Sequence, residues 1–424
     1  MSTPLKDTNI VKTYIGRVRS FSTNARLLLL SVILTGAALG VYRLLFNFYA
    51  LSLDYDESII GTIITINSMT ALILALPMGY LADSLGRKKA FILGSLATSV
   101  AILVMVLWPS LWLLYASSVL MGAAQSLVMV TMAPFMIENS GVEERTYLFS
   151  LSQGIQMTSA FVGNSIGGYL PTWISHSQGV AATSSTAYAG SLGIIVAVSM
   201  LGLIPFFLMK TPTMKREDRS LFAPIGYAAR NWKSFSRLII PMFITSIGAG
   251  LFMPFMNVFF RVVYQQPDPV IGNVLAWGAL FMGVGLLIAP PIADRIGKIP
   301  LVVITQGLSI PFLVMLGFAP WFWMSTIGHY VRLTLMNMGG PVYNAFVMEH
   351  VEPKARAMVA SLVSMSWNFG WAFSPSISGW LQVKYGFGPI FILVLLLYSV
   401  SVYLYWQFFW RGKSAEAPAL SPAD

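Results

Sequence analysis

Two arginines lie inside long apolar stretches of the sequence, where a charged side chain needs a specific reason. Arg43 lies in the apolar stretch 27–51, and Arg332 lies in the stretch 321–348. An arginine at the centre of a membrane helix costs about 2.5–3.5 kcal/mol on insertion scales, so such a residue is by default a candidate for function. The chemistry that it could perform is anion recognition, because a guanidinium binds carboxylate and phosphate groups in a bidentate geometry.

Amide and imidazole side chains share the helix faces of the two arginines. Asn47 follows Arg43 by four residues, and His329 precedes Arg332 by three. Residues three or four apart lie on one face of a helix, so each pair points the same way. The predicted substrate-binding residues are Arg43, Asn47, Gln156, Asn257, His329 and Arg332. His329 could also carry a coupling proton, because histidine titrates near neutral pH. A purely structural, hydrogen-bonded role for it stays open.

The acidic residues fall outside the centres of the apolar stretches. We place Asp83, Glu138, Asp294 and Glu349 at cytosolic helix ends, and Asp54, Asp56, Glu57 and Asp268 in outer loops. Two cations without a counter-charge favour an organic anion as the substrate. Two alternatives stay open. The arginines could extend toward the polar membrane boundary, or methionine- and aromatic-rich stretches could bind lipophilic, drug-like compounds for efflux.

The composition indicates a membrane protein. Of the 424 residues, 56% are hydrophobic and only 10% are charged, whereas soluble domains carry roughly 25% charged residues. The formal net charge of +10 does not indicate nucleic-acid binding, because so few charges cannot build a large basic surface. The sequence has no cysteine and therefore no disulfide or thiolate ligand. We predict neither a metal nor a cofactor.

Apolar stretches of spanning length recur along the chain. A membrane helix needs roughly 20 mainly apolar residues, and by this measure we predict twelve spans. Their approximate limits are 27–51, 57–82, 90–108, 111–137, 147–170, 188–209, 238–263, 270–293, 299–319, 321–348, 357–382 and 387–410. Most of the 26 lysines and arginines fall in alternate loops. The positive-inside rule then predicts a plasma (inner) membrane protein with both termini in the cytosol.

The chain contains an internal repeat. At a constant offset of 211 residues the matching pairs are Gly61 and Gly272, Asp83 and Asp294, Gly86 and Gly297, Arg87 and Lys298, Glu138 and Glu349, Arg145 and Arg356, and Gly168 and Gly379. In the first helix of each half the offset is 210, which relates Gly40 to Gly250 and Asn47 to Asn257. Two parallel six-helix halves with a site between them are typical of many secondary transporters. The predicted segments are a cytosolic segment 1–26, bundles 27–209 and 238–410, a central loop 210–237 and a cytosolic tail 411–424.

The loop after the second predicted span carries the motif G-Y-L-A-D-S-L-G-R-K-K at residues 79–89. This segment resembles the signature G-x-L-A-D-R-x-G-R-K of the major facilitator superfamily, except that Ser84 replaces an arginine. A second copy at residues 290–298 keeps the aspartate and the second glycine but has lost the first glycine. Glu138 and Glu349 each begin an E-x6-R segment that resembles those of sugar porters.

The resemblance implies an all-α membrane protein with twelve transmembrane helices in two pseudo-symmetric six-helix bundles. It implies alternating access without a chemical step, so we predict a transporter and not an enzyme. We expect a monomer in the lipid bilayer with a small-molecule substrate and a possible coupling proton. Ion pairs at the cytosolic boundary would form a reversible gate. The predicted gate residues are Asp83, Arg87, Glu138, Arg145, Asp294, Glu349 and Arg356.

Overall fold

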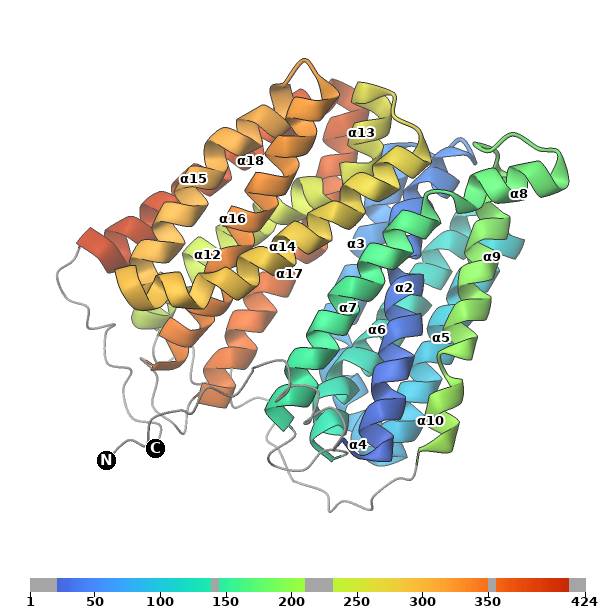
Figure 1. Cartoon of the computed structure of the whole chain (residues 1–424), viewed down its shortest axis with the longest axis horizontal. Coiled ribbons are helices and arrows are strands. Elements are labelled where there is room, and N and C mark those ends of the chain that lie inside the picture. Colours follow the sequence, from blue (N-terminus) through green and yellow to red (C-terminus); the bar gives the residue numbers. More distant parts are fainter. Residues whose placement is uncertain (1–20, 139–144, 210–231, 350–355, 412–424) are drawn as a thin grey trace, which may run out of the picture.

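The structure is a computed structural model that describes residues 21–138, 145–209, 232–349 and 356–411. These residues form helices and contain no strand (Figure 1). The predicted segments 1–26, 210–237 and 411–424 lie mostly outside the described residues.

Two groups of helices make up the two halves of the molecule. The N-terminal half contains α2 (Thr23–Leu51), α3 (Glu57–Ile73), α4 (Ala75–Leu85), α5 (Arg87–Leu107), α6 (Leu111–Glu138), α7 (Arg145–Gly167), α8 (Leu170–Gln178), α9 (Ser185–Leu201) and α10 (Ile204–Leu208). The C-terminal half contains α12 (Trp232–Phe252), the 3-10 turn η1 (Met253–Phe255), α13 (Met256–Tyr264), α14 (Asp268–Ile296), α15 (Lys298–Phe318), α16 (Phe322–Glu349), α17 (Arg356–Tyr385), α18 (Gly388–Tyr405) and the π-helical segment η2 (Trp406–Arg411).

Most of the predicted spans are long, apolar helices. Within the described ranges, eight helical segments are long and apolar enough to cross a membrane, and the pair α3–α4, bent by 58°, makes a ninth. Helices α7, α16 and α17 have 23, 28 and 30 residues but are less apolar. These three helices carry polar side chains such as Gln156 and His329, which lower their hydropathy. That they also span the membrane, for a total of twelve spans, stays a prediction.

Helix ends follow from the local sequence. The side chains of Ser22 and Asp56 accept hydrogen bonds from backbone N–H groups three residues further on, and they begin α2 and α3. Gly86 and Gly297, a pair related by the repeat, separate α4 from α5 and α14 from α15 with φ values of 82° and 93°. Glycine adopts this backbone conformation without strain, so a sharp turn between two helices explains the second glycine of the motif.

The helix packing of one half repeats that of the other. Helix α2 packs on α7 and α9, as α12 packs on α17 and α18. Helices α3 and α5 both pack on α6, as α14 and α15 both pack on α16. The repeat in the sequence is therefore also a repeat in space.

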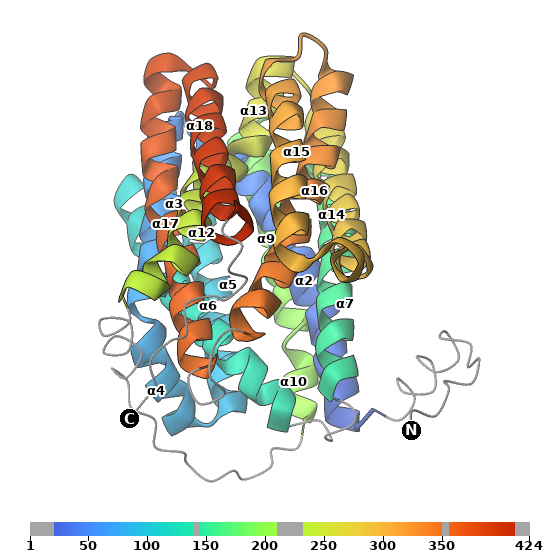
Figure 2. The same ribbon diagram turned by 90° about the vertical axis from the view of Figure 1, so that its left-hand side faces the viewer.

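The two halves lie together at one end of the molecule and diverge toward the other (Figure 1). Helix α3 packs against α17 and α7 packs against α14, and Figure 2 shows these two pairs on opposite sides of the molecule. We call the end that carries α8 and α13 the far side. The opposite end is the motif side, because α4 and the start of α5 carry the motif at residues 79–89.

Four glycines related by the repeat allow the backbones of the two halves to touch. A methyl group at any of them would overlap the backbone of the opposite half. The contacts are Gly61 with Pro375, Gly379 with Glu57, Gly272 with Asn164 and Gly168 with Asp268. The backbone N–H of Ser376 also donates to Thr65 Oγ1 (3.0 Å) across the first of these crossings. Close backbone approach is the ordinary use of small residues between membrane helices.

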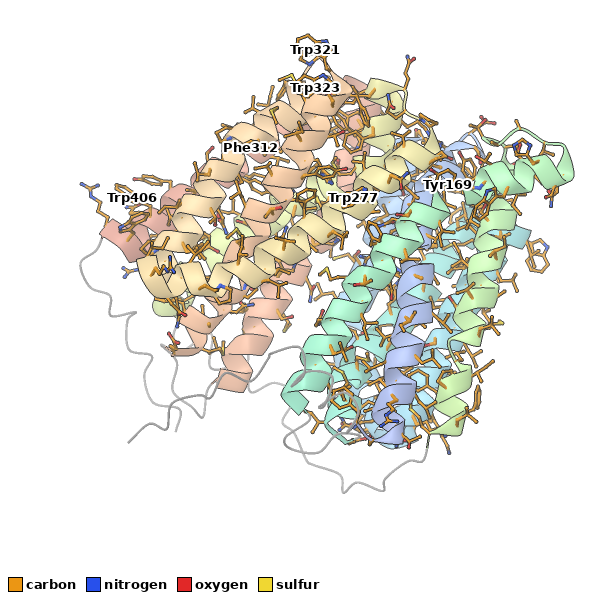
Figure 3. The ribbon with its side chains drawn as sticks, in the orientation of Figure 1. Tyr169, Trp277, Phe312, Trp321, Trp323 and Trp406 are labelled. Atoms are coloured by element: carbon orange, nitrogen blue, oxygen red, sulfur yellow. The ribbon has the colours of Figure 1, made fainter. Side chains whose placement is uncertain are left out.

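Tryptophans lie near both ends of the C-terminal half. Trp321 and Trp323 stack at its far-side end with exposed fractions of 58% and 60%, and Trp406 lies near its other end (Figure 3). Trp277 lies at the junction of the halves, edge-on to Phe161 of α7 (Figure 3). Tryptophan is enriched at both membrane boundaries, so the two end positions agree with a bundle that crosses a bilayer along its helices.

The glycine contacts predict a sharp difference between two substitutions on α14. In Gly272→Ala the new methyl group would lie 2.5 Å from the carbonyl oxygen of Asn164, whereas Gly283 has open space around it. Overpacking of about 1–3 kcal/mol would shift the equilibrium away from the closed far side by roughly 5- to 150-fold. The measurement is the rate of disulfide formation between T65C and S376C, introduced into this cysteine-free chain. We expect G272A to slow it and the control G283A to leave it unchanged, and equal rates would contradict the role of the contact.

Candidate functional site

Asn47 of α2 and Asn257 of α13 join the two halves by reciprocal hydrogen bonds. Asn47 Nδ2 donates to Asn257 Oδ1 (2.9 Å) and to the carbonyl oxygen of Pro254 (2.7 Å). Asn257 Nδ2 donates to the carbonyl oxygen of Leu44 (2.7 Å). The offset of 210 relates Asn47 to Asn257 and Leu44 to Pro254, so the two bonds to carbonyls are equivalent. The centre of the junction therefore has a local two-fold symmetry.

These hydrogen bonds occupy two of the three amide side chains that the sequence predicts to bind substrate, those of Asn47 and Asn257. Both side chains are buried, and both donors of Asn47 bond to the opposite half. Asn257 Oδ1 also accepts the N–H of Val258 (2.9 Å). Contact of these amides with a substrate stays a prediction, because in this conformation they hold the halves together.

Arg43 lies next to this junction on its motif side. It precedes Asn47 by four residues, which is about 6 Å along the axis of α2. Its side chain is exposed although the residue lies well inside a 29-residue helix. Within the described ranges no hydrogen bond or ion pair engages its guanidinium. Its five N–H donors are therefore available to a solute.

Gln156 of α7 lies along the same face of α2 as Arg43. Gly36 precedes Arg43 by two helical turns and shares its face, and a Cβ on Gly36 would lie 3.8 Å from Gln156 Cα. The side chain of Gln156 is exposed, with no hydrogen bond to another described residue. Of the six predicted substrate-binding residues, Arg43 and Gln156 are the two with exposed side chains.

Arg332 lies in the interior of the C-terminal half. Its Nη2 donates to Tyr398 Oη of α18 (2.7 Å), and its Nη1 lies 3.4 Å from Met253 Sδ of η1. The guanidinium carbon lies 4.5 Å from the ring centre of Phe252 and 5.4 Å from that of Tyr398. Arg332 is 2% exposed, and its buried Nε has no partner in the described part of the chain. The structure thus buries a cation whose hydrogen bonding is incomplete.

His329 accompanies Arg332 one turn along α16. Its ring lies edge-on to Phe260, and its Nε2 faces the backbone of Gly278. It is 1% exposed, and Nδ1 has no partner among the residues described. The structure therefore brings Asn47 together with Asn257 and His329 together with Arg332, whereas Gln156 lies about two helical turns from Arg43 along the contact of α2 with α7.

A second cluster seals the far side, and sequence reasoning missed it. Arg261 of α13 lies 3.3 Å from the ring centre of Phe48, donates to Tyr188 Oη (2.8 Å) and forms an ion pair with Asp268. Tyr188 Oη donates to Asp268 Oδ2 (2.7 Å). Phe48 and Tyr188 belong to the N-terminal half, whereas Arg261 and Asp268 belong to the C-terminal half. An arginine of one half thus lies against the ring of Phe48 and the hydroxyl of Tyr188 from the other half.

One signal in the sequence could have revealed the ion pair of this cluster: two opposite charges lie close together in the sequence, at the ends of adjacent predicted spans. Arg261 and Asp268 are seven residues apart, at the end of α13 and the start of α14. The sequence predicts Asp268 in an outer loop, whereas the structure places it as the buried first residue of α14. Its pairing with Tyr188 depends on how the halves dock, which the sequence pattern does not contain.

On the motif side, equivalent ion pairs join neighbouring helices within each half. Arg87 Nε lies 2.6 Å from Glu138 Oε1, and Arg87 Nη2 lies 3.4 Å from Asp83 Oδ1. Lys298 pairs with Glu349 in the same arrangement. The repeat relates Arg87 to Lys298 and Glu138 to Glu349, so each pair links the third helix of its half to the fourth.

The structure says less about the other three predicted gate residues, Asp294, Arg145 and Arg356. Asp294 is exposed at the end of α14. Arg145 and Arg356 begin α7 and α17, and their side chains lie outside the described part of the structure. The gate stays a prediction. Among the residues described, no group of three or more histidine or carboxylate side chains could hold a metal ion.

Comparison with known proteins agrees with the architecture. The sequence matches the Major Facilitator Superfamily over residues 28–340 and 238–423. It is 22% identical to the quinolone resistance protein NorA of Staphylococcus aureus, over 82% of this chain and 86% of that protein. It is also 22% identical to the class H tetracycline resistance protein of Pasteurella multocida, over 80% and 85% of the two chains.

Solved structures show the same fold. A variant of the nucleoside transporter NupG superposes with a TM-score of 0.76 at 14% identity, covering 91% of this chain and all of that one. The predicted all-α membrane fold is confirmed by this match.

The asparagine pair predicts strong coupling between two substitutions. Asn47→Ala and Asn257→Ala should each lower the apparent melting temperature, because each leaves buried polar groups unpaired at about 1–3 kcal/mol. The double variant should melt close to the less stable single variant, because the second substitution removes groups that already lack partners. Melting is followed by tryptophan fluorescence in detergent, with N344A on the exposed face of α16 as the control. Additive losses would contradict the reciprocal arrangement.

The far-side cluster predicts a difference between two buried tyrosines. Tyr188→Phe removes a hydroxyl that links the halves, whereas Tyr49→Phe removes one that bonds to the Met105 carbonyl within the N-terminal half. We expect Y188F to slow disulfide formation between T65C and S376C by roughly 2- to 10-fold. Y49F should leave the rate unchanged. A similar effect of both substitutions would show that the cluster does not hold the far side closed.

Proposed function

Because the chain belongs to the Major Facilitator Superfamily, we propose that it is a secondary transporter that carries a small organic anion by alternating access. A multi-pass membrane transporter, and not an enzyme, is what the family match and the transporter fold indicate. The observation that carries the choice of substrate is Arg43, an exposed guanidinium at the junction of the halves.

The surroundings of Arg43 favour a negatively charged solute. The described carboxylates lie at helix ends, as with Asp83, Glu138 and Asp268, and none pairs with Arg43. A charge-assisted hydrogen bond contributes about 1.5–3 kcal/mol, and a guanidinium can form two of them with one carboxylate. An anion bound at Arg43 would supply the counter-charge that the described carboxylates do not.

The contacts between the halves support an alternating mechanism. The far side is closed by the glycine crossings, the asparagine pair and the Arg261 cluster, whereas the helices diverge toward the motif side (Figure 1). Transport requires these contacts to break while the motif side closes. We assign the motif-side gate to Asp83, Arg87, Glu138, Arg145, Asp294, Glu349 and Arg356.

Orientation and coupling follow as parts of the same proposal. We place the motif side in the cytosol, because Arg87, Lys88, Lys89 and Lys298 lie there and basic residues favour that side. We propose that the transporter acts as a monomer in the plasma membrane. His329 is the candidate carrier of a coupling proton, because its buried Nδ1 lacks a partner in the described residues.

A second candidate function is efflux of drug-like compounds. Two curated relatives are resistance proteins for quinolones and tetracycline. Exposed Met365, Trp367 and Phe369 on α17 would suit a lipophilic solute. A lipophilic substrate would not depend on Arg43, which separates the two candidates.

The test is a thermal-stability screen of the purified protein with organic anions, their neutral analogues and drugs at constant ionic strength. A bound ligand raises the melting temperature by mass action. We expect organic anions to stabilise the wild type. Arg43→Gln should weaken the best of them by roughly 10- to 150-fold, because about 1.5–3 kcal/mol of charge-assisted bonding is lost, and Arg43→Lys should weaken it less.

Uptake into vesicles completes this test. Accumulation of the labelled best ligand beyond binding stoichiometry indicates transport, whereas saturation at stoichiometry contradicts it. Stabilisation mainly by drugs, with equal affinity in R43Q and the wild type, would contradict the anion proposal and favour efflux.

A further inference from the structure

The local symmetry of the junction makes Met253 the counterpart of Arg43. The offset of 210 relates the two residues, as it relates Asn47 to Asn257. Each precedes its asparagine by four residues, and the two asparagines bond to each other. Arg43 and Met253 therefore lie on opposite flanks of the same hydrogen-bonded pair, on its motif side.

The guanidinium of Arg332 lies directly beside Met253. Nη1 of Arg332 is 3.4 Å from Met253 Sδ, so a cation lies near the position that mirrors Arg43 although it comes from a different helix. The repeat also relates Arg332 to Met121 of α6. In the N-terminal half the first helix thus carries the arginine and the fourth helix carries the methionine. In the C-terminal half the first helix carries the methionine and the fourth helix carries the arginine.

The hydrogen bonding of Arg332 is incomplete. Within the described chain, the one oxygen that accepts a hydrogen bond from Arg332 is Tyr398 Oη. The contact with Met253 is to a sulfur, which is a weak acceptor. The Nε of Arg332 has no hydrogen-bond partner among the residues described. His329 Nδ1, one turn away, also lacks a partner there. Buried polar groups are nearly always paired, so exceptions require an explanation. A ligand that reaches Arg332 in another conformation would provide one.

Met253 is suited to cover and uncover this cation. It is partly exposed and contacts the guanidinium, whereas Arg332 itself is buried. It belongs to the 3-10 turn that interrupts the helix between α12 and α13. Its side chain has three rotatable bonds and no branch, so it can move without displacing the backbone.

We propose that Arg332 is a second anion contact of the substrate site, covered in this conformation by Met253, and that the site accepts solutes with two anionic charges. Arg43 binds one charged group from the N-terminal half, and Arg332 binds the other from the C-terminal half. Dicarboxylates and phosphate monoesters have this chemistry. The inference rests on the proposed function, because it adds a second cation to the site of Arg43.

A charge-sensitive labelling experiment tests the position of Arg332 without knowledge of the substrate. Because the chain has no cysteine, M253C introduces a single thiol. Its rate of modification is measured with the anionic 2-sulfonatoethyl and the cationic 2-trimethylammonioethyl methanethiosulfonates. We expect R332Q to lower the ratio of anionic to cationic rates by about fivefold, as removal of one nearby charge would. R332K should restore the ratio, and R295Q, a distant exposed arginine, should not change it.

The outcomes separate this inference from the proposed function. If R43Q lowers the ratio and R332Q does not, the inference fails and the anion site at Arg43 stands. If neither substitution lowers it, both fail. A thiol in M253C that reacts with neither reagent would also overturn the inference, because Met253 must border the space that the solute enters.

Binding of two matched probes tests the preference for two charges. Succinate and butyrate are titrated calorimetrically into the wild type, M253A and the volume-conserving control M253L. We expect M253A to tighten succinate binding by about tenfold relative to butyrate, because Arg332 is uncovered, and M253L to resemble the wild type. R332Q should abolish the gain. Equal changes for both probes, or no binding of either to any variant, would contradict the inference.

Discussion

Direct contact between the backbones of the two halves is the constraint on which the rest of this structure depends. Gly61, Gly168, Gly272 and Gly379 let α3 cross α17, and α7 cross α14, without intervening side chains. Short amide side chains can reach carbonyls across the junction only when the backbones of the two halves are this close, as Asn47 and Asn257 do. The same approach brings Tyr188 to Asp268. All of these bonds therefore form together or break together as the far side closes or opens.

The second constraint is the high energy of a charge in an apolar bundle, and the two arginines meet it differently. Arg43 has its guanidinium exposed beside the junction, so solvent or solute can satisfy it. Arg332 is buried, and the rings of Phe252 and Tyr398 with one hydroxyl stabilise it only in part. A buried charge with unsatisfied donors raises the energy of the conformation that buries it. A conformation that exposes Arg332 to an anion is therefore favoured by binding itself, which is how a ligand shifts a conformational equilibrium.

Sequence reasoning predicted what depends on one segment or on a regular repeat. The helical fold, the matched halves and the turn at Gly86 follow from apolar length, offset and local backbone preference. The bond of Asn47 to Asn257 and that of Arg261 to Tyr188 did not follow, because each joins the two halves and the docking of the halves has no local signature. The burial of Arg332 was missed for a related reason: its side chain contacts Tyr398 of α18, and the periodicity of one helix does not say which neighbour covers a given face.

The repeat also explains how a firmly closed far side remains compatible with movement. A carrier needs two conformations of similar energy, because a large difference would trap it in one of them. Each hydrogen bond across the far side contributes only about 0.5–1.5 kcal/mol, yet their sum would be large without compensation. The second half carries the same glycines and matched charges as the first at one offset, and on the motif side Arg87–Glu138 and Lys298–Glu349 sit at equivalent positions. These two ion pairs lie within their own halves and are already formed, so the bonds that offset the opening of the far side must be new contacts between the halves on the motif side. If the two conformations then differ little in energy, as the proposed alternating access requires, the ligand and its gradient would set the direction of transport.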